Sequence, residues 1–181
     1  KLNNNYFSTE ANKENLSFIL EISKKLNLNK NLLFKTIQTF KGLKYRQQIV
    51  FKKNNLTIIN DSKSTSFSSS ISVLKVNHNI HWLLGGIHKK GDKLKLHKRY
   101  FENIKAYIYG RNQKFFNKKL KGKIEYKNFN NLSDALKNII KVIKKQRDTK
   151  KTVLFSPSAA SFDAFKNFEE RGFYFDKLLK K

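Results

Sequence analysis

Apolar residues recur at helical spacing in the first forty residues of the chain. Over residues 13–26 an apolar side chain returns every three or four positions, and a second stretch with this period follows at about 29–40. Gly42 is typical of a residue that ends a helix. The pattern predicts two helices and a boundary near residues 41–44.

After this boundary the period of the apolar positions falls to two. Residues 47–53 alternate apolar and polar side chains, and residues 56–60 form a second short apolar run. Asn54 and Asn55 between them suit a two-residue turn, because asparagine tolerates the left-handed backbone that such turns need. The pattern predicts an antiparallel hairpin.

The rest of the chain repeats one theme, a short apolar strand followed by a polar or glycine-rich loop and a helical segment. Strands are predicted at 56–60, 81–84, 106–109 and 153–155, and helices at 66–75, 92–100, 112–120, 132–146 and 161–180. Alternating strands and helices indicate an α/β fold, with a mainly parallel sheet and helices on both faces.

Length and composition fit one ordinary domain with an appendage. The 181 residues include no cysteine, which excludes disulfides and cysteine-based zinc sites and is typical of the cytoplasm. The apolar runs are far shorter than the ~20 residues that span a bilayer, and no signal-peptide pattern appears. We expect a soluble, cytoplasmic monomer without a membrane partner.

The formal net charge of +26 raises the question of an anionic partner. Lysines occur along the whole chain and do not concentrate in one arm or on one helix face, which favours a solvated basic surface without a specific nucleic-acid site. A non-catalytic module that binds an anionic metabolite or nucleic acid stays open as an alternative.

Three polar loops follow predicted strands, at residues 60–66, 85–92 and 156–161. In open α/β sheets ligands bind outside the carboxyl ends of the strands. The hydroxyl, ammonium and carboxylate groups of these loops suit a small dianionic ligand or phosphates, although each loop taken alone could merely cap a helix. Neither a G-x-x-x-x-G-K-[ST] nor a G-x-G-x-x-G motif is present, and the four histidines show no metal-ligand spacing.

Four segments resemble the Mur ligase family of amino-acid-adding enzymes, and in particular its D-glutamate-adding branch. They are FKGLKYR at 40–46, INDSKST at 59–65, LLGG at 83–86 followed by Lys89, and SPSAASFDAFKNFEERGFYF at 156–175. The last segment is typical of the D-glutamate-adding branch, which disfavours another ligase of this fold such as a folylpolyglutamate synthase. The resemblance runs over essentially the whole chain.

The resemblance implies the C-terminal part of a three-domain enzyme. Residues 1–41 would end the central ATP-binding domain, and residues 42–181 would form the amino-acid-binding domain. The implied enzyme uses ATP and Mg²⁺ to turn the carboxylate of UDP-N-acetylmuramoyl-L-alanine into an acyl phosphate, which the amine of D-glutamate attacks. Since the sugar-nucleotide and ATP phosphate sites would lie in other domains of the same polypeptide, we expect this chain alone to be inactive and to bind no cofactor.

The resemblance also implies roles for single residues. Lys63 would act in catalysis at the phosphate region, and no residue would bind a metal. Nucleotide contacts would come from Asn15, Arg46 and Asp61, and D-glutamate contacts from Thr65, Lys89, Ser161, Phe162 and Phe168. Two positions depart from the family pattern, because Ala11 precedes Asn12 where His-Asn is common and Ser66 replaces an asparagine.

Overall fold

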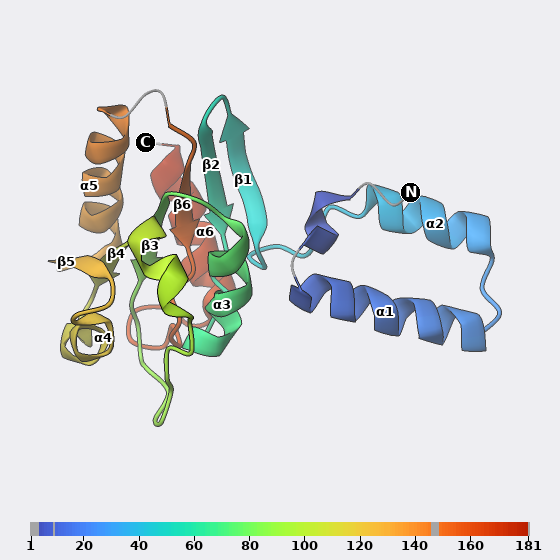
Figure 1. The fold of residues 1–181 in the computed structure, drawn as a ribbon, viewed down its shortest axis with the longest axis horizontal. Helices are drawn as coiled ribbons and strands as arrows, with labels where there is room; N and C mark the ends of the chain where they lie inside the picture. The colour runs from blue at the N-terminus through green and yellow to red at the C-terminus, as the bar shows by residue number, and fades with distance from the viewer. Residues whose placement is uncertain (1–3, 9, 146–148, 181) are drawn as a thin grey trace. The chain divides into compact units, whose positions relative to one another are not determined.

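The computed structural model describes residues 4–8, 10–145 and 149–180 and divides the chain into two compact units, Lys1–Leu43 and Lys44–Lys181 (Figure 1). The first unit contains η1 (Asn5–Ser8), α1 (Glu10–Lys25) and α2 (Lys30–Thr39). The second contains β1 (Gln48–Lys53), β2 (Leu56–Asn60), α3 (Phe67–Val76), β3 (Ile80–Leu84), η2 (Lys98–Asn103), β4 (Ile104–Tyr109), α4 (Gln113–Leu120), β5 (Glu125–Phe129), α5 (Leu132–Lys144), β6 (Lys151–Phe155) and α6 (Phe168–Leu179).

The first unit is the predicted helical pair. The side chain of Asn29 accepts hydrogen bonds from the backbone N–H groups of Asn31 and Leu32 and so begins α2. Tyr6 packs edge-on against Phe40, with ring centroids 5.1 Å apart. Many apolar side chains of the two helices remain exposed, among them Phe18 and Leu32. The assignment of this unit to a larger ATP-binding domain stays a prediction.

The second unit is built on a six-stranded sheet in the order β1-β2-β6-β3-β4-β5. β1 pairs with β2 antiparallel, as the hairpin pattern predicts, and all the other neighbours are parallel. Asn54 takes the left-handed backbone at the hairpin turn, with φ of 50°. The mainly parallel α/β fold predicted from the alternation of strands and helices is therefore confirmed.

Helices cover both faces of this sheet (Figure 1). Trp82 and Leu84 of β3 pack on one face with residues of α3 and α4, whereas Leu83 packs on the other face with residues of α5 and α6. Successive side chains of a strand point to opposite faces, so a strand buried on both sides needs a continuous apolar run. All five residues of β3 are buried.

Three sequence predictions about this unit were wrong. The helix predicted at 92–100 is absent over residues 92–97, and only the short 3-10 helix η2 follows. Leu94 and Leu96 stand two positions apart, so an extended segment can direct both side chains onto the core. The helix expected from residue 161 begins at Phe168, because the Asn167 side chain accepts from the Glu170 N–H and caps it there. The predicted end of the 132–146 helix at residue 146 lies outside the described residues.

The third error is β5, which the sequence analysis missed. Its five residues, EYKNF, are mostly exposed, and the strand pairs with β4 at one edge of the sheet. Polar and charged residues are common on edge strands, where they discourage pairing with other chains. Such a strand lacks the apolar run that revealed the central ones.

His81 on β3 makes the stability of the fold depend on pH. Its imidazole is buried and lies 3.0 Å from the hydroxyl of Tyr107, and burial, aided by Lys105 and Lys151, lowers its pKa from 6.5 to about 4. Below pH 6.5 the imidazole of His81 binds a proton in the unfolded chain but stays neutral in the folded protein. The free energy of unfolding therefore decreases as the pH falls towards 4. We expect His81→Gln to lose less stability than the wild type between pH 7 and 5 in urea unfolding. Equal losses would contradict this assignment.

Candidate functional site

Three loops meet where neighbouring strands end. We call residues 60–66 the first loop, 85–92 the second and 156–161 the third; they follow β2, β3 and β6, which are adjacent in the sheet. Backbone hydrogen bonds join them: Asp61 N–H donates to the Phe155 carbonyl at 2.7 Å, and Gly85 N–H donates to the Pro157 carbonyl at 3.1 Å. The three polar loops therefore form one continuous edge.

The second and third loops are paired directly. Ile87 and Ala160 each donate a backbone N–H to the carbonyl of the other, both at 2.9 Å. Gly86 permits this approach, because its φ is +125° and a Cβ there would lie 2.3 Å from the Ala160 carbonyl oxygen. The pairing brings the backbone before Lys89 next to the backbone before Ser161.

Asp61 is a buried centre of the first loop. It is 4% exposed, and its carboxylate accepts hydrogen bonds from the Gln47 N–H and from the hydroxyls of Ser64 and Ser156. Burial raises its pKa to about 6, although these hydrogen bonds and the charge of Arg171 act in the opposite direction. The side chain joins the first loop to the third and to the segment before β1.

Removing the charge of Asp61 should change how stability varies with pH. Because the folded protein raises the pKa of Asp61, it binds the carboxyl proton more tightly than the unfolded chain does. The stability that this proton contributes is fully present below pH 3.8, the pKa in the unfolded chain, and is lost as the pH rises through about 6. Asp61→Asn stays neutral throughout, so we expect its stability relative to the wild type to increase between pH 4.5 and 7.5, measured by urea unfolding. A constant difference across this range would show that the carboxylate does not titrate in it.

Lys63, Arg46 and Phe168 lie around this centre. The Lys63 ammonium stands 4.0 Å from the ring centroid of Phe168. The backbone N–H of Lys63 donates a hydrogen bond to the backbone carbonyl of Tyr45 at 2.9 Å. Arg46, which is exposed, stands between Tyr45 and Gln47 in the segment bonded to the first loop. Lys63 and Phe168, which the family resemblance gives to the phosphate and to the amino acid respectively, are thus neighbours.

The remaining predicted site residues differ in exposure. Lys89 and Thr65 are exposed on the second and first loops, whereas Ser161 is only 2% exposed. Phe162 is 71% exposed and therefore lies at the surface. Asn15 is exposed on α1 of the first unit, so its predicted nucleotide contact stays a prediction.

Two contributors to this edge were missed from the sequence. Arg171 on α6 is 1% exposed and donates hydrogen bonds to the first and third loops. Asp92, at the end of the second loop, accepts from the N–H of Phe67 at 2.7 Å and ties that loop to the first turn of α3. Arg171 lies on α6, away from the strand ends where the sequence analysis searched, whereas Asp92 lies in the second loop but was given no role there.

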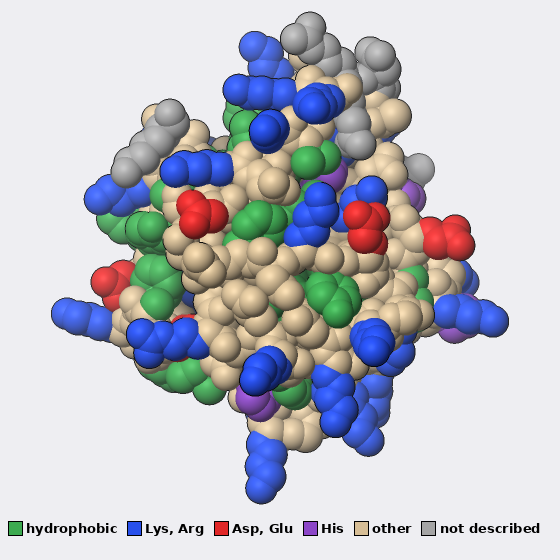
Figure 2. All heavy atoms as spheres, turned by 90° about the vertical axis from the view of Figure 1, so that its left-hand side faces the viewer, with side chains coloured by type: hydrophobic (Ala, Val, Ile, Leu, Met, Phe, Trp, Pro, Cys, Tyr) green, Lys and Arg blue, Asp and Glu red, His purple; other side chains and the backbone are tan. Residues whose placement is uncertain are grey.

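On the face that Figure 2 presents, the basic side chains do not form a separate surface. Figure 2 shows Lys and Arg spread over the face that it presents, interspersed with apolar and uncharged groups. Among the described residues no three His, Asp or Glu side chains come together as a possible metal site, and no helix is long and apolar enough to cross a membrane.

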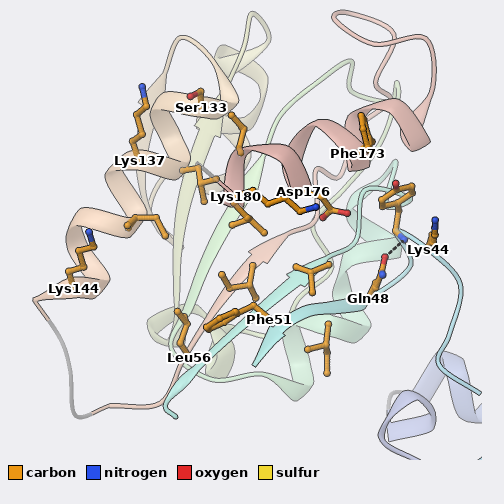
Figure 3. Close-up of a pocket in the computed structure, with 18 residues that line it drawn as sticks. Lys44, Gln48, Phe51, Leu56, Ser133, Lys137, Lys144, Phe173, Asp176 and Lys180 are labelled. Carbon is orange, nitrogen blue, oxygen red and sulfur yellow. Dashed lines mark hydrogen bonds between the residues drawn. The ribbon is translucent and has the colours of Figure 1, made fainter. Parts of the chain in front are cut away.

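A large groove lies elsewhere in the second unit. It has a volume of about 1010 Å³ and lies between the β1-β2 hairpin, α5 and α6. Figure 3 shows Phe51 and Leu56 on the hairpin and Lys137 and Lys144 on α5 around it. None of the described residues that line it belongs to the three loops, so the groove is not part of the candidate site.

Comparison with known proteins finds relatives that all carry the same name. The chain is 36% identical over 171 residues to UDP-N-acetylmuramoylalanine--D-glutamate ligase of Rickettsia felis, with 94% of this chain and 38% of the relative covered. The ligases of the same name from a Wolbachia of Brugia malayi and from Francisella tularensis are 33% and 36% identical, again over 94% of this chain. No family model matches the chain.

The chain is homologous to the C-terminal portion of UDP-N-acetylmuramoylalanine--D-glutamate ligase. It spans 34% to 41% of the length of these relatives. A solved structure of UDP-N-acetylmuramate-alanine ligase from Thermotoga maritima superimposes with a TM-score of 0.61 at 15% identity, covering 96% of this chain and 39% of that one. This likeness shows that the chain shares the α/β fold of the part of that structure that it covers.

Proposed function

We propose that this chain is the part of a D-glutamate-adding Mur ligase that brings the amino acid to the activated substrate in peptidoglycan precursor synthesis. The observation that supports it is that the loops bearing Lys63, Lys89 and Ser161 are joined at one sheet edge, in a chain homologous to D-glutamate ligases over 94% of its length. The complete reaction would consume ATP and join D-glutamate to UDP-N-acetylmuramoyl-L-alanine.

D-glutamate presents two carboxylates and an amine, and the loops offer matching groups. We assign the carboxylates to the ammonium of Lys89 and to the hydroxyls of Ser161 and Thr65, since charge-assisted bonds to carboxylates are strong. Phe168 would cover the methylene groups. Phe162, now largely exposed, would have to turn onto the ligand to contribute.

The nucleotide would lie at the part of the same sheet edge that carries Lys63 and Arg46. Lys63 would place its charge where the phosphoryl group transfers, and Arg46 would reach the ribose side of ATP from the segment bonded to the first loop. Asp61 is buried, so we propose that it chiefly holds this segment and the third loop in place. Asn15 would contact the adenine.

The chain's own contribution to catalysis is then position and charge. Holding the amine beside the reacting carbon replaces an encounter in solution by a fixed geometry, and a preplaced ammonium offsets the negative charge that gathers during phosphoryl transfer. Mg²⁺ would supply further charge in the complete enzyme. We assign no residue of this chain to the metal.

The amino-acid site can be tested on this chain directly. In an NMR titration, D-glutamate should shift the amide resonances of residues 61–66, 85–92 and 156–161, whereas L-glutamate should shift them much less. Ligase activity of the complete gene product with ATP and both substrates provides the second test. Equal responses to the two enantiomers, together with no D-glutamate-dependent release of ADP, would overturn the proposal.

A further inference from the structure

Arg171 stands out among the buried residues, because its guanidinium is almost fully enclosed and yet forms no salt bridge with a carboxylate of the described residues. It lies one turn into α6, where burial lowers its pKa while Tyr109, Asp163 and Asp61 act in the opposite direction. Taking a guanidinium out of water is costly unless its N–H groups are satisfied. The acceptors that satisfy it belong to the candidate site.

The guanidinium binds two loops at once. Its Nε donates to the Ser62 hydroxyl at 3.1 Å, one terminal nitrogen donates to the Ser62 carbonyl at 2.7 Å, and the other donates to the Ala159 carbonyl at 2.9 Å. Ser62 belongs to the first loop and Ala159 to the third. A planar fork of donors spans these diverging acceptors, which the single ammonium of a lysine cannot do.

These contacts lie one or two residues from proposed site residues, since Ser62 precedes Lys63 and Ala159 stands two positions before Ser161. The Ser62 hydroxyl also donates to the Phe168 carbonyl at 2.8 Å, so the contact fixes the backbone on both sides of the Lys63–Phe168 pair. Ala159 precedes Ala160, whose paired hydrogen bonds with Ile87 hold the second loop. The second loop approaches Arg171 itself, since a Cβ on Gly86 would lie 3.2 Å from its terminal nitrogen.

We propose that Arg171 is the positioning residue of the amino-acid site, which sets the spacing of Lys63, Lys89 and Ser161 by holding their three loops together. The role rests on the proposed function for its substrate. It differs from the roles of the ligand-contacting residues, because the enclosed guanidinium acts only through backbone and hydroxyl groups of the loops.

The test compares Arg171→Lys with the wild type, because lysine keeps the charge and much of the side-chain length and removes the fork. Arg171→Met serves as a second variant that also removes the charge. Arg99→Lys is the matched control, since Arg99 is exposed and rests on the ring of Tyr100 outside the site. Two readouts are needed, one on this chain alone and one on the complete gene product.

On this chain, amide hydrogen exchange should accelerate locally in Arg171→Lys, at the N–H groups of Lys63, Ile87 and Ala160, and remain unchanged within β3. In the complete gene product, the KM for D-glutamate should rise about tenfold or more while that for ATP stays within about threefold, since positional contacts of the amino acid are lost. Arg99→Lys should change neither the loop exchange nor the KM for D-glutamate. Arg171→Met should change both quantities more than Arg171→Lys does.

The two failures are distinguishable. If Arg171→Lys leaves the loop exchange unchanged, or accelerates it without raising the KM for D-glutamate relative to ATP, Arg171 is not the positioning residue. If the wild-type gene product shows no D-glutamate-dependent ligation, the proposed function fails. Whether Arg171 holds the loops together is then judged by the local hydrogen exchange alone.

Discussion

Replacing Lys63 with alanine in the complete gene product is expected to lower kcat about 10²- to 10³-fold, because preplaced charge at a transferring group counts most in the transition state. The Lys63 ammonium lies on the ring of Phe168, a contact that holds it at the edge of the site, and no carboxylate of the described residues forms a salt bridge with it. Steady-state kinetics with saturating ATP and D-glutamate measure the effect. The KM for D-glutamate should change much less than kcat.

Two controls separate the charge of Lys63 from its packing. Lys63→Met removes the ammonium and keeps an unbranched apolar side chain, so it should lose kcat as Lys63→Ala does. Phe168→Leu removes the ring beneath the ammonium and leaves the charge, so it should affect the KM for D-glutamate more than kcat. A normal kcat in both Lys63 variants would show that this lysine does not act on the transferring phosphoryl group.

The central part of the fold could be predicted because its strands are buried on both faces. β3, β4 and β6 are mostly apolar segments between polar loops, and a sequence shows such segments directly. β5 could not be predicted in this way, since an edge strand with exposed side chains resembles a loop. Residues 92–97 were mistaken for a helix because alternation of strand and helix was extended to a segment that packs as an extended chain.

The positions of the three loops could also be predicted, because the carboxyl ends of parallel strands share one edge and the polar residues after each strand are visible in the sequence. What joins the loops could not. In a chain with 39 lysines and arginines, nothing in the sequence marks Arg171 as a buried one. Asp61 likewise looks like an exposed loop carboxylate, and only the structure shows three donors converging on it.

These two buried charges explain how a loop edge keeps a fixed shape. Asp61 accepts from the segment before β1 and from the third loop, while Arg171 donates to the first and third loops. Loops are ordinarily the most mobile parts of an α/β domain. Here each loop that bears a proposed ligand contact is bonded to at least one other, so the exposed lysines project from an ordered base.

Lys89→Ala and Ser161→Ala, made separately in the complete gene product, are expected to raise the KM for D-glutamate roughly ten- to a hundredfold, since losing a charge-assisted contact costs about 1.5 to 3 kcal/mol. The KM for ATP should stay within a few-fold, because both residues stand on the loops assigned to the amino acid. Initial rates over a range of D-glutamate and ATP concentrations separate the two constants.

Lys90→Ala is the matched control for Lys89, because Lys90 is the next residue of the same exposed loop and bears the same charge. A specific contact predicts a normal KM for D-glutamate in Lys90→Ala, whereas a general attraction by the basic surface predicts similar, salt-sensitive losses in both variants. Ser161 is 2% exposed, so Ser161→Ala must also keep the wild-type unfolding midpoint for its KM to be informative. Should Lys89→Ala instead lose affinity for ATP, the second loop would belong to the nucleotide, and the assignment of the two substrates along this edge would be reversed.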